Sequence, residues 1–84
     1  MAELTVTVRL PEGLHARPAA EIASICAQYA SATVAKFGHQ PVDATSILSL
    51  LTLGAKSGDT LIFRVEGPNC EDALSRIELL VTAP

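Results

Sequence analysis

Apolar and polar residues alternate along two segments of this chain, residues 4–10 and residues 60–66. Alternation is typical of a half-buried strand, because successive side chains point to opposite faces of a sheet. We therefore predict a strand in each segment, with the apolar residues facing a common core. These inward-facing residues are Leu4, Val6, Val8, Leu10, Leu61, Phe63 and Val65.

Two further strands are predicted at residues 33–37 and 40–44. They are joined by Gly38-His39, and a two-residue loop that opens with glycine suits a type II′ hairpin turn. Pro41 has no N–H to donate to a neighbouring strand, so the second of these strands is predicted at a sheet edge. In the first of them, the expected inward-facing residues are Thr33, Ala35 and Phe37.

Apolar residues recur at helical spacing in two long segments. The first covers residues 16–29 and has Pro18 in its first turn, where the missing N–H costs nothing. The second follows Asn69 as a candidate N-cap, with Glu71 and Asp72 favourably placed in its first turn. The two apolar faces consist of Ala19, Ile22, Ala23, Cys26, Tyr29, Ala73, Leu74, Ile77, Leu80 and Val81.

A short helix is predicted over residues 46–53, with Ser46 as its N-cap and Gly54 as its C-terminal stop. Apolar residues surround nearly the whole of it, although a core-facing helix needs only one stripe. We expect Leu50 and Leu53 to point inward. The others would form an exposed patch of the kind that marks a partner surface, made of Leu48 with Ile47 or Leu51.

The order strand, helix, strand, strand, helix, strand, helix predicts an α+β fold, in which helices cover one face of a four-stranded antiparallel sheet. At 84 residues, 49% of them hydrophobic, the chain is long enough for one small domain over residues 1–84. One sheet face is expected to stay wet, because polar strand residues point away from the core. They are Thr5, Thr7, Arg9, Arg64 and Glu66.

Composition argues against several classes of protein. The net charge of −3 and the scarcity of aromatic residues disfavour binding to nucleic acid or to an anionic membrane. No apolar run approaches the roughly 20 residues of a membrane span. The N-terminus lacks the basic and apolar regions of a secretory signal. We expect a cytoplasmic monomer that does not insert into a membrane.

The two cysteines, Cys26 and Cys70, form neither a CxxC motif nor a metal-ligand spacing with histidine. We therefore expect no metal site, and reduced thiols typical of the cytosol, although a Cys26–Cys70 disulfide stays open. No phosphate-binding P-loop is present, and we expect no cofactor.

The segment Gly13-Leu14-His15-Ala16-Arg17-Pro18-Ala19-Ala20 places a histidine at the start of the first predicted helix. A helix N-terminus attracts phosphate through its unpaired N–H groups and the positive end of its dipole. The N–H groups of Ala16 and Arg17 can therefore receive phosphoryl oxygens, and the Arg17 guanidinium can add charge-assisted hydrogen bonds. Because a neutral imidazole is a nucleophile, the segment offers what a protein needs to accept a phosphoryl group on a histidine and pass it on.

This segment, together with Ser46-Ile47-Leu48-Ser49-Leu50-Leu51-Thr52-Leu53-Gly54, resembles the HPr family, the histidine phosphocarriers of the bacterial sugar phosphotransferase system. The resemblance covers nearly the whole chain in element order and length. It implies an open-faced β-sandwich with strand order 1-4-2-3 and three helices on one face. It also implies that His15 takes phosphate through Nδ1 from Enzyme I, which phosphoenolpyruvate charges, and passes it to sugar-specific IIA proteins or domains. The protein would be a carrier, not an enzyme with its own small-molecule substrate.

Two positions leave alternatives open. Glu12 stands where familiar family members often have Asn or Ser, and its carboxylate would repel phosphorylated His15, pair with Arg17, or point into solvent. One role for Ser46 is structural only, as the N-cap of its helix. The other is regulatory and is implied by resemblance to the Gram-positive branch of the family, in which an ATP-dependent HPr kinase/phosphorylase phosphorylates the equivalent serine and the product binds a catabolite-control transcription factor. The surface for Enzyme I and IIA is expected to comprise Glu12, Ile47, Leu48 and Leu51.

Three other functions remain as alternatives. A specialised HPr paralogue would relay phosphate for nitrogen regulation or dihydroxyacetone phosphorylation. A regulatory binding module would act through Ser46 and the Leu48 patch without any phosphate relay. A ligand-binding α+β domain would resemble this chain in topology alone and would carry no covalent phosphate.

Overall fold

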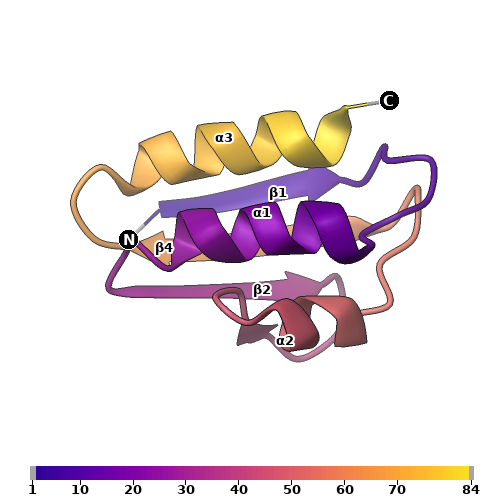
Figure 1. Cartoon of the computed structure of the whole chain (residues 1–84), viewed down its shortest axis with the longest axis horizontal. Helices are drawn as coiled ribbons and strands as arrows, with labels where there is room; N and C mark the ends of the chain where they lie inside the picture. The colour runs from indigo at the N-terminus through magenta and orange to yellow at the C-terminus, as the bar shows by residue number, and fades with distance from the viewer. Residues whose placement is uncertain (1, 84) are drawn as a thin grey trace.

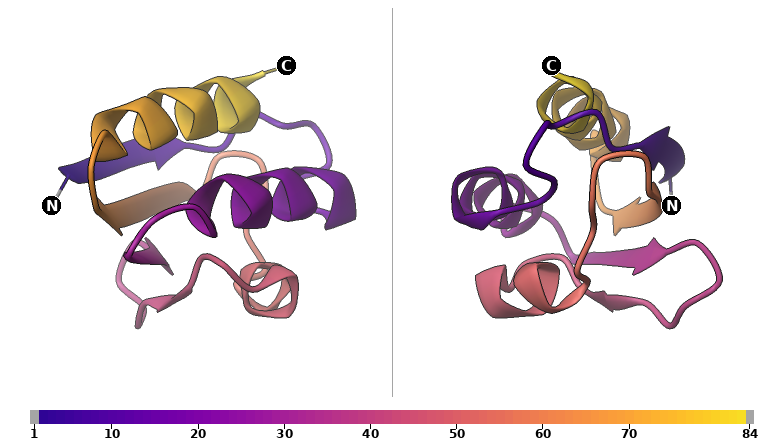
Figure 2. Two further views of the ribbon diagram at one scale, coloured as in Figure 1. Left: turned by 60° about the vertical axis from the view of Figure 1, so that its left-hand side comes forward. Right: turned by 90° about the vertical axis from the view of Figure 1, so that its right-hand side faces the viewer.

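The computed structural model describes residues 2–83. Four antiparallel strands form one sheet in the order β1-β4-β2-β3, and three helices cover one of its faces (Figures 1 and 2). Both the α+β class and the strand order agree with expectation. The elements are β1 (Ala2–Thr7), α1 (Ala16–Cys26), β2 (Ser31–Lys36), β3 (Val42–Asp43), α2 (Ile47–Thr52), β4 (Thr60–Glu66) and α3 (Cys70–Thr82).

The core lies between the sheet and the helices and, within residues 2–83, contains no buried polar or charged side chain. Phe63 of β4 is fully buried at its centre, opposite Leu4 on one side and Val34 on the other. The predicted inward faces of β4, α1 and α3 are confirmed, since their apolar residues are buried or packed against the core. The N-terminal end of α1 and the C-terminal ends of β1 and β2 lie at the same end of the molecule (Figure 1).

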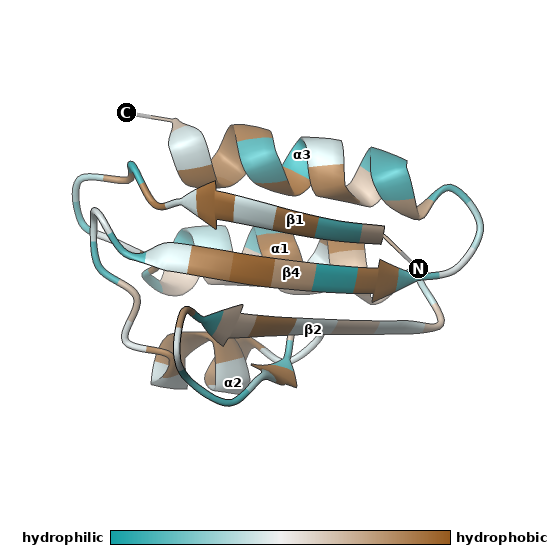
Figure 3. Cartoon of the chain, turned by 180° about the vertical axis from the view of Figure 1, so that it is seen from behind, coloured by the Kyte–Doolittle hydropathy of each residue, from teal (hydrophilic) through white to brown (hydrophobic). Residues whose placement is uncertain are grey.

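The far face of the sheet carries no helix, and hydrophilic residues occur among hydrophobic ones along its strands (Figure 3). Arg64 of β4 lies opposite Glu3 of β1, and the Arg64 Nε donates to Glu3 Oε2 at 2.6 Å. Thr5, Thr7 and Glu66 are exposed. The expected solvent-exposed face is therefore confirmed for the strand residues, whereas Arg9 is exposed but lies beyond the end of β1.

The hairpin between β2 and β3 differs from the prediction. β3 has only two residues, and five residues rather than two separate it from β2. The His39 N–H donates to the Lys36 carbonyl at 2.8 Å, and Gly38 has φ +84° at the third position of this turn. A positive φ at that position defines a type II turn, whereas type II′ needs it one residue earlier. The edge position of β3 is confirmed.

The inward face predicted for β2 is wrong. Ala32 and Val34 are buried, whereas Phe37 is 71% exposed and Thr33 and Ala35 are half-buried. The reason is the pairing with β4, which sets Val34 opposite the buried Phe63. Because the side-chain period of a strand is two, this register turns every other residue of β2 outward.

Two helix ends also differ from the prediction. α1 ends at Cys26, and the Tyr29 hydroxyl, beyond its end, donates to the Asn69 carbonyl at 3.3 Å. Asn69 does occupy the N-cap position of α3, but its side chain makes no capping hydrogen bond. Its backbone is left-handed, with φ +61°, a conformation that Asn tolerates better than most residues.

Cys26 and Cys70 are both buried and free, so no disulfide joins them. Burial, and to a smaller extent the nearby carboxylate of Asp43, raises the pKa of the Cys26 thiol to about 11. Nowhere in residues 2–83 do three His, Cys, Asp or Glu side chains gather closely enough to hold a metal ion. Likewise, no helix of this part of the chain is long and apolar enough to cross a membrane.

Candidate functional site

The loop between β1 and α1 carries His15 at its end, and its backbone contacts a distant segment of the chain, residues 54–59. The Gly13 N–H donates to the Leu10 carbonyl at 2.9 Å, and Gly13 has φ +71°. A Cβ at Gly13 would lie 2.5 Å from the Ala55 carbonyl oxygen, so the close approach requires glycine. The next residue, Leu14, is buried and donates its N–H to the same Ala55 oxygen at 3.0 Å.

His15 occupies the N-cap position of α1, with extended backbone at φ −100° and ψ −169°. Its carbonyl accepts the first helical hydrogen bond from the Ala19 N–H at 3.1 Å. Its imidazole is exposed and makes no capping hydrogen bond, so the ring stays accessible from solvent.

The first turn of α1 leaves two peptide N–H groups available beside this ring. Pro18 has no N–H, and among the hydrogen bonds of residues 2–83 neither the Ala16 nor the Arg17 N–H has an acceptor. Orphan N–H groups and the positive end of the helix dipole make such a site attractive to an anion. The two N–H groups that the sequence predicts to receive an anion are therefore free of protein acceptors within residues 2–83, and His15 directly precedes them.

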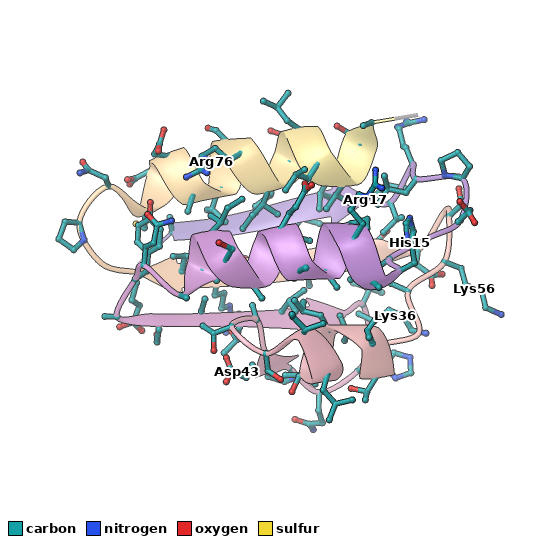
Figure 4. The ribbon with its side chains drawn as sticks, in the orientation of Figure 1. His15, Arg17, Lys36, Asp43, Lys56 and Arg76 are labelled. Atoms are coloured by element: carbon teal, nitrogen blue, oxygen red, sulfur yellow. The ribbon has the colours of Figure 1, made fainter. Side chains whose placement is uncertain are left out.

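Cationic side chains gather at the same end of the molecule. Figure 4 shows Arg17 and Lys56 at the end where His15 lies, with Lys36 below them near α2. Of these, the Lys36 ammonium lies 4.0 Å from the Asp59 carboxylate, which offsets part of its charge. The local charge is thus more positive than the net charge of −3 implies, and it favours the approach of an anionic group.

His15 and Arg17 lie at one end of an open groove between α1 and α3, with a volume of about 1140 Å³. Glu12 lines the same groove and is exposed. No ion pair joins Glu12 to Arg17 in the part of the chain that the structure describes. Of the alternatives for Glu12, pairing with Arg17 is therefore not realised in this state.

Helix α2 lies beside α1 on the same face of the sheet (Figure 2). Ser46 caps it as predicted, because its Oγ accepts from the Ser49 N–H at 3.2 Å. Leu50 is fully buried, and Leu53 packs against the core. The remaining apolar residues face solvent, as expected: Leu48 is 72% exposed, Ile47 45% and Leu51 39%.

The sequence predicted the positions of His15, Arg17 and the short helix, but it did not predict which segment contacts the backbone that leads into His15. The loop from Gly54 to Asp59 lies some forty positions further along the chain and touches the His15 segment through Ala55. The one signal in the sequence was Gly13, since an isolated glycine often marks a close backbone approach. The sequence does not indicate which segment would approach it.

Comparison with known proteins agrees with this geometry. The family model described as "PTS HPr component phosphorylation site" matches residues 2–83. The chain is 40% identical over 82 residues to the phosphocarrier protein HPr of Streptomyces coelicolor, covering 96% of this chain and 88% of that protein. It is 34% identical over 83 residues to the HPr of Mycoplasma pneumoniae, covering 96% of this chain and 93% of that one.

Among solved structures, the HPr of Bacillus anthracis superposes with a TM-score of 0.84 at 28% identity, covering 95% of both chains. These matches place the chain in the class of small phosphocarrier proteins. The chain belongs to the HPr family, the phosphocarrier proteins of the phosphotransferase system.

Proposed function

We propose that His15 is the residue that carries the phosphoryl group, through its Nδ1. The lone pair of the neutral ring nitrogen attacks the phosphorus of a phosphorylated donor protein. The bond from phosphorus to the donor's nitrogen breaks, and its electron pair returns to the donor. The three phosphoryl oxygens then lie close to the N–H groups of Ala16 and Arg17 and to the Arg17 guanidinium.

The observation that carries this proposal is the exposed, uncommitted imidazole beside two N–H groups without acceptors. Catalysis at such a site consists of positioning and charge stabilisation, which is what phosphoryl transfer requires. Since the site holds the transferred group on the protein itself, we propose a carrier that turns over no small-molecule substrate of its own.

Family membership supports Enzyme I, charged by phosphoenolpyruvate, as the donor and sugar-specific IIA proteins or domains as the acceptors, with the relay taking place in the cytoplasm. We assign their docking surface to the exposed apolar residues of α2 together with the rim of the His15 site. These residues are Glu12, Ile47, Leu48 and Leu51. An exposed apolar cluster beside a reactive residue is typical of a protein interface.

The test is phosphorylation of the protein by Enzyme I and phosphoenolpyruvate, followed by mass spectrometry before and after acid treatment. We expect a mass increase of one phosphoryl group that acid removes, because phosphohistidine is acid-labile. His15→Ala should abolish the increase, whereas His39→Ala should retain it, since His39 lies exposed at the β2–β3 hairpin. Retention of the acid-labile phosphate in His15→Ala would refute the assignment.

A second pair of variants tests whether the Arg17 guanidinium assists phosphorylation. Arg17→Ala should slow phosphorylation about tenfold, the loss of one charge-assisted hydrogen bond. Arg76→Ala is the matched control, because Arg76 lines the same groove from α3 but lies away from His15 (Figure 4). Equal rates for the two variants would show that Arg17 contributes only general charge.

We further propose Ser46 as a regulatory site for an HPr kinase/phosphorylase and ATP, and a catabolite-control transcription factor as a partner of the phosphorylated form. Ser46 is half-buried, and its Oγ accepts from the Ser49 N–H, so the hydroxyl proton is not used in that hydrogen bond. In the proposed step Oγ attacks the γ-phosphorus of ATP, the bond between that phosphorus and ADP breaks, and the hydroxyl proton passes to a base of the kinase. Incubation with the kinase should give an acid-stable phosphate that Ser46→Ala lacks and Ser57→Ala keeps. Phosphate on Ser57 or on neither serine would contradict the proposal.

The pathway served by the relay is decided by the acceptor. Comparing rates of transfer from the phosphorylated protein to sugar-specific, nitrogen-related and dihydroxyacetone-related acceptors would separate the main proposal from the specialised paralogues. We expect the sugar-specific IIA proteins to accept fastest.

A further inference from the structure

One peptide unit of the distant 54–59 loop, the one between Ala55 and Lys56, lies against the backbone that leads into His15. The carbonyl of this unit accepts from the Leu14 N–H at 3.0 Å and lies against Gly13. Leu14 and Gly13 directly precede His15, so the position of this carbonyl determines where the loop enters α1.

The opposite side of the same peptide unit is held by Asp59. The Lys56 N–H donates to Asp59 Oδ2 at 2.8 Å. In a planar trans peptide the N–H and the C=O point in opposite directions, so a partner on the N–H fixes the direction of the C=O. The carboxylate therefore orients the carbonyl that receives Leu14, and it polarises that carbonyl as an acceptor.

Asp59 is itself held firmly by the surrounding backbone. Its N–H donates to the Lys56 carbonyl at 2.9 Å, and its carbonyl accepts from the Val8 N–H at 2.8 Å. The Gly58 N–H donates to the Val8 carbonyl at 2.8 Å. The turn is thereby tied to the chain just beyond β1, the strand from which the His15 loop departs.

We propose that Asp59 is a positioning residue for His15: its carboxylate orients the Ala55–Lys56 peptide, which in turn holds Leu14 and sets the ring of His15 over the free N–H groups of α1. This inference rests on the proposed role of His15 as phosphoryl acceptor. Asp59 touches neither the ring nor the anion site, and acts only through the backbone between them. Displacement of a reacting group by about 1 Å can lower transfer rates by about a hundredfold, and a smaller displacement lowers them less.

The test compares three variants of the full chain. Asp59→Ala removes the acceptor, whereas Asp59→Asn keeps an amide oxygen that can accept from the Lys56 N–H and removes the charge near Lys36. Ser57→Ala, an exposed position in the same turn, is the control. The Asp59 side chain is 35% exposed, so its truncation leaves no core cavity and the variant should fold.

We expect Asp59→Ala to lower kcat for phosphorylation of His15 by Enzyme I about tenfold with little change in KM, because docking residues are untouched. Asp59→Asn should recover most of the rate, and Ser57→Ala should equal the wild type. An Asp59→Ala variant that is folded and transfers at the wild-type rate would overturn the proposal. So would equal losses in Asp59→Ala and Asp59→Asn, because the charge would then matter and not the hydrogen bond.

Hydrogen exchange of the Leu14 amide gives a readout that does not depend on phosphorylation. In Asp59→Ala this amide should exchange faster than in the wild type, while the amides of Val34 and Phe63 in the central strands stay protected. Unchanged Leu14 protection refutes the positioning role even if His15 proves not to be the acceptor. Conversely, faster Leu14 exchange in a protein that carries no phosphate on His15 refutes the proposed function while leaving the structural link intact.

Discussion

Replacing Gly13 by alanine tests whether the contact with the 54–59 loop shapes the His15 site. Two costs arise from the structure. The backbone at Gly13 has φ +71°, and an L-residue in the left-handed region costs about 1–2 kcal/mol. The new Cβ would also lie 2.5 Å from the Ala55 oxygen and 3.0 Å from the Lys56 Cα. Both atoms are backbone, so no side-chain rotation relieves the clash, and the forced shift adds about 1–3 kcal/mol.

Gly38→Ala is the matched control for this variant. Gly38 has φ +84°, but no neighbouring heavy atom lies within 4 Å of the position that its Cβ would take. The free energy of unfolding of Gly38→Ala should therefore fall only by the conformational cost of the left-handed backbone, about 1–2 kcal/mol. Urea unfolding followed by far-ultraviolet circular dichroism suits a protein without tryptophan and measures both free energies.

We expect Gly13→Ala to be less stable than Gly38→Ala by about 1–3 kcal/mol, and to be phosphorylated more slowly, because Leu14 and His15 move with the displaced loop. Equal losses of stability would refute the reasoning, since the contact with Ala55 would then contribute nothing beyond the dihedral angle. A stability gap without any change in the phosphorylation rate would show that the site tolerates the shift.

Three further predictions concern titratable groups. Hydrogen bonds from the hydroxyl and the N–H of Thr45 lower the pKa of Asp43 below its ordinary 3.8. The Asp43 carboxylate therefore stabilises the folded protein above about pH 4, and this contribution is lost as the pH falls further. The difference in unfolding free energy between the wild type and Asp43→Asn should shrink over that range. The pKa of the Cys26 thiol is raised from 9.0 to about 11 in the folded protein, so this thiol ionises at lower pH in the unfolded chain. Urea unfolding should therefore show the stability of the wild type falling between about pH 9 and pH 11. Cys26→Ala should lack this decline. Glu12→Gln should slow hydrolysis of phosphorylated His15 about two- to fivefold, measured as the decay of acid-labile phosphate, if repulsion acts; an unchanged decay would place the Glu12 carboxylate in solvent.

The sequence predicts best where one signal dominates. Residues 60–66 alternate cleanly, and β4 has those bounds and that buried face. Pro18 can lie only in a first turn, and α1 accordingly begins at Ala16 beside His15. Ser46 and Gly54 bracket α2 as their capping preferences predict.

The buried face of β2 and the turn type of the β2–β3 hairpin were predicted wrongly, because the local sequence is compatible with two alternatives in each case. Residues 31–37 hold small or apolar residues on both faces, and the large Phe37 favours the wrong one. Only the pairing of Val34 with Phe63, a contact between distant segments, decides which face is buried. The hairpin is a similar case, because Gly38 suits two turn types and the placement of the turn depends on where β2 meets β3.

A carrier must release the group that it binds, and the geometry at the start of α1 is consistent with that requirement. Each hydrogen bond from the protein to the phosphoryl oxygens would lower the free energy of the phosphorylated state by at most about 1.5–3 kcal/mol once exchange with water is included. Pro18 removes one donor from the first turn, which leaves the N–H groups of Ala16 and Arg17. The exposed position of His15 keeps water in competition with both. Glu12 lines the same groove, and repulsion by its carboxylate, which Glu12→Gln tests, would weaken the hold further. With His15 in its proposed role, this arrangement would hold a phosphoryl group weakly enough that an acceptor protein can remove it.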